Sequence, residues 1–208
     1  MTTLLLIRHG ETPWNVLAKV QGCQNIALSE TGKAQASLLS ERLNGAFTAV
    51  YTSPLHRAFE TAEIICKPTQ LSPIPLEALK EVDFGSWEGL TFKEISKLYP
   101  THFNTWLTDE STGPMYDGDG SIQNVSRRAK ACIYSIVQKH PNETIVMVSH
   151  GGLIKSALIG LFDWKMNMYH HFALGNTCIT TIRFDEAQKP MLVSLNDTTH
   201  LNTPVTAV

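Results

Sequence analysis

Two copies of one short pattern, near opposite ends of the chain, constrain the fold more than any other feature. In the first copy an apolar run at 4–7 is followed at once by Arg-His-Gly at 8–10, and in the second an apolar run at 144–148 is followed by Ser-His-Gly at 149–151. Short apolar runs bounded by breaking residues are typical of buried strands. Because open α/β sheets bind ligands at the carboxyl ends of parallel strands, we expect the two histidines to face each other across one crevice.

The segment after the first strand predicts a helix, a strand and a second helix. Ser29 is a suitable N-cap for a helix that ends at Gly45. A strand is expected over 47–52, followed by a helix with Ser53 as its cap, a proline next to it, and Arg57 in its first turn. A cation is unfavourable at a helix N-terminus, so Arg57 indicates an anion that binds both the arginine and the helix amides.

The rest of the chain also alternates between strands and helices. Pro75 is tolerated only at a sheet edge, and Pro100 divides a helical pattern into two short helices. The expected elements are an edge strand at 74–76, a shaped loop at 79–89, two short helices over 91–106, a long helix over 121–140, a helix over 151–161, and outer strands over 177–184 and 191–195.

Charge and cysteine placement exclude several classes of protein. The chain has 208 residues, 43% of them apolar, with a formal net charge of −2 and no basic run, so we expect a globular fold and no nucleic-acid partner. The four cysteines include no C-x-x-C pair, which argues against a zinc site or a disulfide framework. Arg8 ends the first apolar run too early for a signal peptide or a membrane span, so we expect a cytoplasmic protein without a membrane partner.

Several separated motifs occur in an order that resembles the histidine phosphatase (phosphoglycerate mutase-like) superfamily, and the match covers most of the chain. The resemblance implies an α/β three-layer sandwich with a mostly parallel central sheet and helices on both faces. It also implies a single domain over 1–208, with residues 82–120 as a helical and loop flap over the active site. The matching motifs are Arg8-His9-Gly10-Glu11-Thr12 with Asn15, Gln21-Gly22, Leu28-Ser29 with Gly32, Ser53-Pro54-Leu55 with Arg57-Ala58 and Thr61-Ala62, Glu81 with Phe84-Gly85 and Trp87-Glu88-Gly89, and Ser149-His150-Gly151.

The resemblance implies a role for each site residue and requires no metal or cofactor. His9 would be the nucleophile that forms a phosphohistidine, and nearby arginines would keep it uncharged. Glu81 would protonate the leaving oxygen and then take a proton from the attacking water. The phosphoryl oxygens would be bound by Arg8, Arg57, His150, Asn15, Gln21 and the amide of Gly151.

One segment departs from the family pattern. Members often carry Gly-Gly-Glu-Ser before the long helix, whereas the aligned residues are Gly118-Asp119-Gly120-Ser121, so that Gly120 stands at the glutamate position. Ser121 can still cap the helix. The effect of this departure on substrate contacts stays open.

Two alternatives to a phosphatase stay open. Phosphoglycerate mutases carry Arg-His-Tyr-Gly directly after the acid, whereas Val82-Asp83-Phe84-Gly85 follows Glu81 here, a form similar to small-molecule phosphatases that include α-ribazole phosphatases. Phosphoserine and broad-specificity phosphatases are further possibilities within this class. A non-catalytic phospho-ligand module would need the cations but no acid, so Glu81 favours an enzyme. The physiological substrate and the choice between monomer and homodimer are not determined.

Two further features have competing interpretations. No lysine or arginine lies between Lys97 and Arg127, although four acidic residues do, and this segment is either a solvated loop or a mobile lid. An acidic lid would favour a monophosphate ester with a neutral or cationic leaving group. His170 and His171 could suggest a metal site, but adjacent histidines in a strand point to opposite faces, so we expect a structural or surface role.

Overall fold

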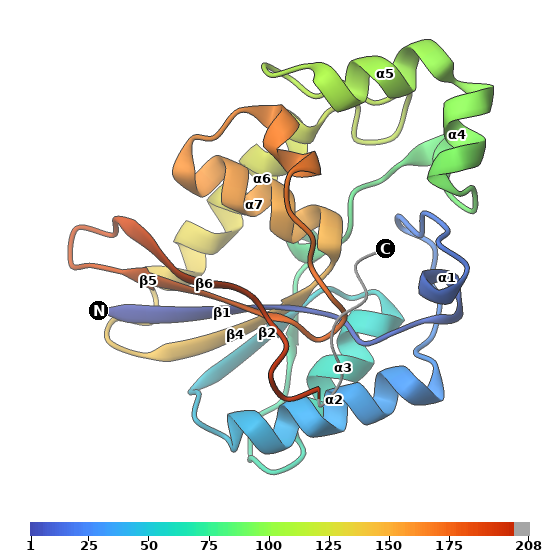
Figure 1. Ribbon diagram of the computed structural model, residues 1–208. Coiled ribbons are helices and arrows are strands. Elements are labelled where there is room, and N and C mark those ends of the chain that lie inside the picture. The colour runs from blue at the N-terminus through green and yellow to red at the C-terminus, as the bar shows by residue number, and fades with distance from the viewer. Residues whose placement is uncertain (202–208) are drawn as a thin grey trace.

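The two strands that end in the histidine motifs lie side by side at the centre of a six-stranded sheet. The computed structural model describes residues 1–201, and its sheet has the order β3-β2-β4-β1-β5-β6 (Figure 1). Strands β3, β2, β4 and β1 are parallel, and β5 and β6 run antiparallel to them. The strands are β1 (Thr2–Arg8), β2 (Ala49–Thr52), β3 (Ile74–Pro75), β4 (Thr144–Ser149), β5 (Ile179–Phe184) and β6 (Pro190–Asp197).

Helices cover both faces of this sheet and extend beyond one end of it. In Figure 1, α2 and α3 lie below the sheet, α6 and α7 lie above it, and α4 and α5 lie farther out, on the side of the strands' carboxyl ends. The predicted three-layer α/β architecture is therefore confirmed. The helices are α1 (Pro13–Val16), α2 (Glu30–Leu43), α3 (His56–Cys66), α4 (Phe92–Leu98), α5 (Pro100–Thr108), α6 (Ile122–Val137) and α7 (Gly151–Phe162), with short 3₁₀ helices at Glu77–Leu79, Gly85–Trp87 and Met166–His170.

The central strands are apolar on both faces because both faces are buried. Leu4 and Leu6 of β1 join the core beneath α6 and α7, whereas Ile7 joins the core against α2 and α3. The same alternation divides β4, where Met147 and Val148 face opposite layers. Each such side chain contributes about 1.5–3 kcal/mol when it is fully buried, so both layers hold the central strands in register.

Most of the predicted elements are present, with shifts at some boundaries. The edge strand, the two helices divided at Pro100, the long helix capped by Ser121 and the two outer strands are confirmed. The prediction that Ser53 caps the following helix is wrong. Helix α3 begins at His56 with Leu55 as its N-cap, because the Ser53 hydroxyl accepts a hydrogen bond from the Leu55 amide at 3.2 Å and also bonds to a histidine of β4's motif.

The His-His pair also differs from its prediction. His170 ends a 3₁₀ helix rather than lying in a strand, its Nε2 lies 3.1 Å from the carbonyl oxygen of Trp106, and its ring centroid is 4.3 Å from the Trp106 ring. Burial lowers the pKa of His170 to about 4, so it packs as a neutral side chain. Its contacts are structural.

Residues 82–120, predicted as a flap, form a helical segment built on an aromatic cluster. The Trp87 ring contacts the rings of Trp106 and Phe103 at centroid distances of 5.4 and 6.1 Å. The single-domain boundaries and the mobility of this flap stay predictions, and residues 202–208 lie outside the described part of the chain. Within the described part, none of the helices is both long and apolar enough to cross a bilayer.

Candidate active site

The parallel pairing of β1 and β4 brings the two predicted histidines together. Arg8 is in register with Ser149, so the residues that follow them, His9 and His150, leave the sheet at the same point. Their ring centroids are 5.2 Å apart, and the two residues are 2% and 0% exposed. Gly10 allows the turn after His9 to pass close to the start of α2, because a Cβ there would lie 2.5 Å from the carbonyl oxygen of Gly32.

His9 is oriented by a hydrogen bond to its own turn. Its Nδ1 lies 2.6 Å from the carbonyl oxygen of Gly10, which can only accept, so the ring proton is assigned to Nδ1 and Nε2 carries the lone pair. Burial, followed by the charges of Arg57 and Arg8, holds the pKa of His9 well below its usual value. His9 is therefore an uncharged imidazole with an unprotonated Nε2 at neutral pH.

Arg57 extends from the second residue of α3 to the same nitrogen. Its Nε donates to His9 Nε2 at 3.2 Å, and its two terminal nitrogens donate to the carbonyl oxygens of Gln24 and Gly22, both at 2.7 Å. The side chain is 0% exposed, and burial lowers its pKa to about 10, so it remains charged at neutral pH. A buried cation that binds only neutral acceptors is well suited to bind an anion.

Two buried nitrogens in this cluster have no hydrogen-bond partner among the described residues. They are Nε of Arg8 and Nδ1 of His150. Nη1 of Arg8 donates to the Leu174 carbonyl, and Nε2 of His150 pairs with the Ser53 hydroxyl at 2.8 Å. Burial, together with the arginines and His9, holds the pKa of His150 well below its usual value. We call Arg8, His9, Arg57 and His150 the phosphate cluster, after the role that the sequence predicts for them.

Glu81 lies across from this cluster, at the N-terminus of α7. Its Oε1 accepts hydrogen bonds from the amides of Val82 at 2.9 Å and Leu153 at 2.8 Å, and its Oε2 accepts one from the amide of Gly152 at 3.1 Å. Gly152 lets the carboxylate approach the helix, because a Cβ there would lie 2.7 Å from Oε1. The helix terminus thus fixes the position of the carboxylate.

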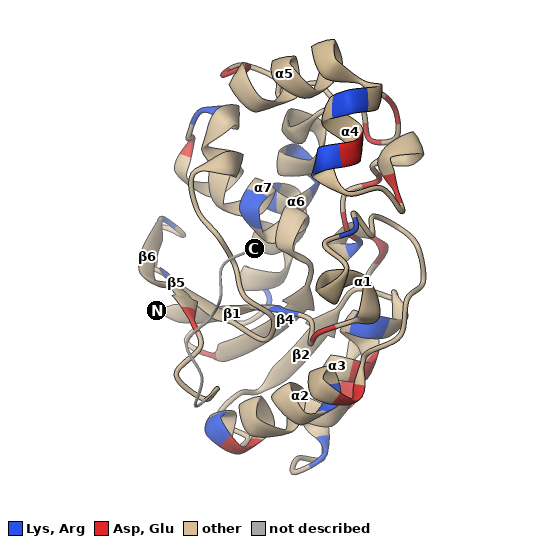
Figure 2. Cartoon of the chain, turned by 45° about the vertical axis from the view of Figure 1, so that its right-hand side comes forward, with Lys and Arg blue, Asp and Glu red and all other residues tan. Residues whose placement is uncertain are grey.

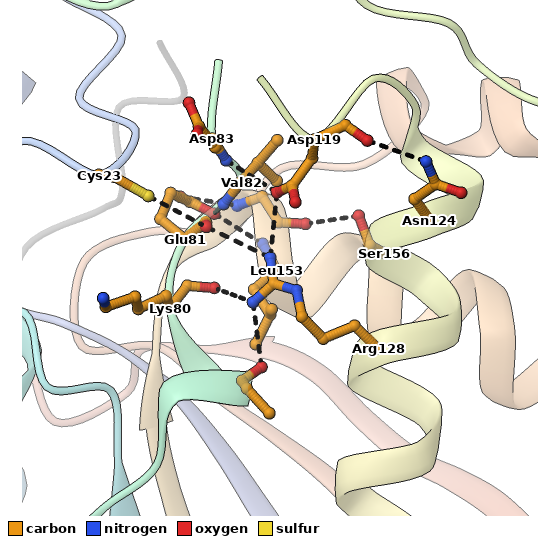
Figure 3. Close-up of polar contacts among 12 residues, drawn as sticks. Cys23, Lys80, Glu81, Val82, Asp83, Asp119, Asn124, Arg128, Leu153 and Ser156 are labelled. Carbon is orange, nitrogen blue, oxygen red and sulfur yellow. Dashed lines mark hydrogen bonds and ion pairs between the residues drawn. The ribbon is translucent and has the colours of Figure 1, made fainter. Parts of the chain in front are cut away.

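The backbone that carries Glu81 is held from the opposite side by helix α6. Figure 3 shows Arg128 of α6 extending to this loop, with Asp119 and Asp83 beyond it. Arg128 binds carbonyl oxygens of the loop and the Asp119 carboxylate, which also accepts from the Asp83 amide at 2.9 Å. We call residues 78–84 the acid loop. Nothing in the sequence pointed to Arg128, because its partners in this loop lie about 50 positions earlier.

The three remaining predicted ligands surround the same region. Asn15 Oδ1 accepts from the Thr12 amide at 3.0 Å, and Gln21 Oε1 accepts from the Thr12 hydroxyl at 3.0 Å. The amide of Gly151 lies at the first residue of α7, beside the Arg8 guanidinium. The structure therefore brings all the predicted site residues to one end of the sheet.

The predicted site residues other than His150 border a cavity of about 610 Å³ at the carboxyl ends of β1 and β4. His150 is not in direct contact with the cavity and lies behind His9. The charged lining residues are four cations and two carboxylates, namely Arg8, Lys19, Arg57, Lys155, Glu11 and Glu81. An anionic ligand is therefore favoured at this position.

The acidic residues of the flap do not contribute to the lining of this cavity. Asp109 accepts hydrogen bonds from the amides of its own loop, Asp117 accepts from the Ser86 amide, and Asp119 pairs with Arg128. Figure 2 shows acidic segments of the flap on the loops around α4 and α5, and bands of both charges on α4 itself. The basis for expecting a neutral or cationic leaving group is therefore absent.

Two contributions to the site were missed in the sequence. Asn176 Nδ2 donates to the His9 carbonyl oxygen at 3.0 Å, and the Thr177 amide donates to that of Arg8 at 3.1 Å, with Thr177 in a left-handed conformation (φ 55°). Lys155 lies over the Tyr169 ring, 5.1 Å from its centroid. Lys155 could have been found, because it is the one charged residue within an otherwise apolar helix.

Among residues 1–201 no group of three or more histidine, cysteine, aspartate or glutamate side chains could hold a metal ion.

Comparison with known proteins identifies the family of the chain. The profile of the histidine phosphatase superfamily (branch 1) matches residues 4–198. The chain is 31% identical to phosphoserine phosphatase 1 of Hydrogenobacter thermophilus, over 97% of this chain and 95% of the relative, and 30% identical to a metal-independent phosphoserine phosphatase of Arabidopsis thaliana, over 97% and 84%. A mutant phosphoserine phosphatase from Entamoeba histolytica, solved with phosphoserine, is 40% identical, with a TM-score of 0.90 over 97% of this chain and 100% of that one. The chain belongs to the histidine phosphatase superfamily, branch 1, and is one of its phosphatases, as its motifs predicted.

Proposed function

We propose that the chain hydrolyses a small phosphate monoester through a phosphohistidine on His9. The observation that carries this proposal is the state of the His9 ring, which is uncharged, has its ring proton on Nδ1, and has its Nε2 lone pair accepting from the Arg57 Nε–H at 3.2 Å. A nucleophile beside a buried cation can approach a phosphoryl group that the same cation binds.

The reaction takes place in two displacements at phosphorus. His9 Nε2 forms an N–P bond while the ester P–O bond breaks, and the leaving oxygen takes the proton of the Glu81 carboxyl group. The Glu81 carboxylate then removes a proton from a water molecule, whose oxygen displaces His9 and releases inorganic phosphate. Both groups end in their starting states, so the cycle is balanced.

Arginine contacts supply the charge stabilisation. One cation about 4 Å from a phosphoryl charge contributes about 4 kcal/mol at an effective dielectric near 20. We assign this role to Arg8 and Arg57, with Asn15, Gln21 and the Gly151 amide as hydrogen-bond donors; His150, predicted from the sequence as a further ligand, is uncharged and does not border the cavity. Contacts that tighten as the P–O bond breaks accelerate the reaction without requiring a metal ion.

We propose phosphoserine or a similarly compact carboxylated ester as the substrate. The relatives named above are phosphoserine phosphatases, and the net cationic lining of the cavity suits a leaving group that carries a carboxylate. A phosphoglycerate mutase is less well supported, because the residues after Glu81 are Val82, Asp83 and Phe84 and add no cation. A non-catalytic module that only binds a phosphorylated ligand would not require a general acid such as Glu81. The cytoplasmic location stays a prediction from sequence, which made no choice between a monomer and a homodimer.

The test is the variant His9→Ala, with the exposed His171→Ala as its control. We expect His9→Ala to abolish hydrolysis of p-nitrophenyl phosphate and of phosphoserine, and the control to retain normal activity with or without a chelator. Quenching of the wild-type enzyme with ³²P-labelled substrate in alkaline detergent should trap label that is stable to base and labile to acid, as expected of phosphohistidine. Full turnover by His9→Ala, or activity lost to the chelator, would refute the proposal.

A further inference from the structure

We infer that Arg128 and Asp119 are positioning residues for Glu81, holding the acid loop so that the carboxyl group meets the leaving oxygen. This inference rests on the proposed role of Glu81 as the general acid. Neither residue borders the cavity, so neither can contact a substrate held there. Any effect they have on catalysis passes through the loop that carries Glu81.

Arg128 hydrogen-bonds to the backbone of the acid loop before Glu81 and at Glu81 itself. Its Nη1 donates to the carbonyl oxygens of Ala78 at 3.1 Å and Lys80 at 3.0 Å, and its Nη2 lies 3.4 Å from that of Glu81. A planar guanidinium can hold several acceptors in one fixed arrangement, which an ammonium group cannot do. Because α6 is packed against the core, it provides a rigid anchor for this contact.

Asp119 hydrogen-bonds to the acid loop on the C-terminal side of Glu81. Its Oδ2 accepts from Arg128 Nη2 at 3.2 Å and from the Asp83 amide at 2.9 Å, and its own amide donates to the Asp83 carbonyl oxygen at 3.0 Å. Gly118 permits this approach, because a Cβ there would lie 2.1 Å from the Asp83 carbonyl oxygen. The acid loop is therefore fixed on both sides of Glu81, by the Arg128 guanidinium before it and by the Asp119 carboxylate after it. These two groups also bond to each other (Figure 3).

The two ends of the Glu81 residue thus have separate supports. Its backbone is fixed by α6 through Arg128 and Asp119, and its carboxylate is fixed by the amides at the start of α7. General acid catalysis depends on hydrogen-bond reach to the leaving oxygen, so a shift of the loop affects proton transfer before it affects phosphate binding.

This arrangement also explains the departure from the family pattern in the segment before α6. Gly120 stands where members often carry glutamate, but Asp119 supplies a carboxylate one residue earlier. Asn124 of α6 donates to the Asp119 carbonyl oxygen at 2.9 Å and keeps the turn in place. The function of this segment is therefore to support the acid loop rather than to contact the substrate.

The experiment compares esters that differ in their need for an acid. The variants are Arg128→Met and Asp119→Asn, with Arg127→Met, an exposed neighbour on α6, as the matched control and Glu81→Gln as the reference. The substrates are 2,4-dinitrophenyl phosphate, whose leaving group departs without a proton, and phosphoserine, whose alkoxide requires one. The measured quantity is kcat/KM, which includes only the steps up to departure of the leaving group.

We expect Arg128→Met and Asp119→Asn to lower kcat/KM for phosphoserine by about 10- to 100-fold and for the dinitrophenyl ester by less than about 3-fold. Arg127→Met should match the wild type on both. Equal losses on both esters in Asp119→Asn, with an unchanged melting temperature, would overturn the inference. If Arg128→Met does not fold, the same criterion applies to Asp119→Asn alone. If Glu81→Gln itself shows no leaving-group dependence, the acid role of Glu81 in the proposed function fails instead.

Discussion

The phosphate cluster and the acid loop face each other across one cavity, yet they are held in different ways. The phosphate cluster projects from β1, from β4 and from the first turn of α3, and His9, Arg57 and His150 are almost completely buried. The acid loop has only short 3₁₀ turns around it, and Glu81 and Asp83 are partly exposed. Its position depends on side-chain contacts from α6 and on the amides at the start of α7.

In the proposed mechanism this difference corresponds to two tasks of the site. The phosphate cluster would meet a group that every substrate shares, so it can be rigid and can tolerate no change in charge. The acid loop would meet the leaving group, which differs between substrates. We therefore expect damage to the phosphate cluster to slow all esters equally, and damage to the acid loop to slow only those that need a proton.

The largest effect in this comparison is expected for Arg57→Met. Loss of one phosphoryl contact worth about 4 kcal/mol lowers kcat/KM by about 10³-fold for good and poor leaving groups alike. The charge of Arg57 also helps to lower the pKa of His9, so the pKa rises in the variant and the acid limb of the pH–rate profile moves to higher pH. Steady-state kinetics between pH 4 and 8 measure both the fall in kcat/KM and the position of the acid limb, with the exposed Arg183→Met as control. If the acid limb stays at the same pH in the variant, the charge of Arg57 does not control the pKa of His9.

A smaller and selective effect is expected for Gly152→Ala on the acid-loop side. The new Cβ would lie 2.7 Å from Glu81 Oε1 and 2.7 Å from the Tyr169 hydroxyl, so the carboxylate must move away from α7. We expect kcat/KM for phosphoserine to fall by about 30-fold while that for 2,4-dinitrophenyl phosphate stays within about 3-fold. Equal losses on both esters would show that the two regions are not separable.

The smallest effect is expected for Lys155→Met, which belongs to neither region. Burial, then the charge of Arg8, lowers the pKa of Lys155 to about 8, so its positive charge is present below that pH and lost above it. Below pH 8 the variant should show a KM for phosphoserine raised about 5-fold, or ~1 kcal/mol, with kcat nearly unchanged. The wild-type KM should rise toward that of the variant as the pH passes 8. Lys189→Met, in the turn between β5 and β6, is the control, and a KM that does not vary with pH would exclude a role for Lys155 in binding.

The phosphate cluster could be predicted almost completely from the sequence. His9 and His150 each follow an apolar run directly, so placing the strands also placed the histidines. Arg57 was found because a cation in the first turn of a helix is locally unfavourable. The helix boundary near Ser53 was nevertheless wrong, because the hydroxyl of Ser53 is bound to His150, a residue 97 positions away.

The acid loop could be predicted only in part. The motif around Glu81 identified the carboxylate, but the sequence did not show that Arg128 binds this loop or that Asp119 binds Arg128. The acidic flap was misjudged for the same reason, since charge composition does not show which carboxylates are already paired. Asp109, Asp117 and Asp119 all bind protein groups.

The sequence by itself determined the two histidines and Arg57, because each of these lies next to a strand end or in the first turn of a helix, and the order of its motifs determined the family and, through that resemblance, the architecture. Only the tertiary structure decided the protonated nitrogen of His9, the support of Glu81 and the net charge of the cavity. These depend on contacts between segments distant in the chain, and such contacts form only when the packing of both faces of the sheet fixes the position of every loop at its carboxyl edge.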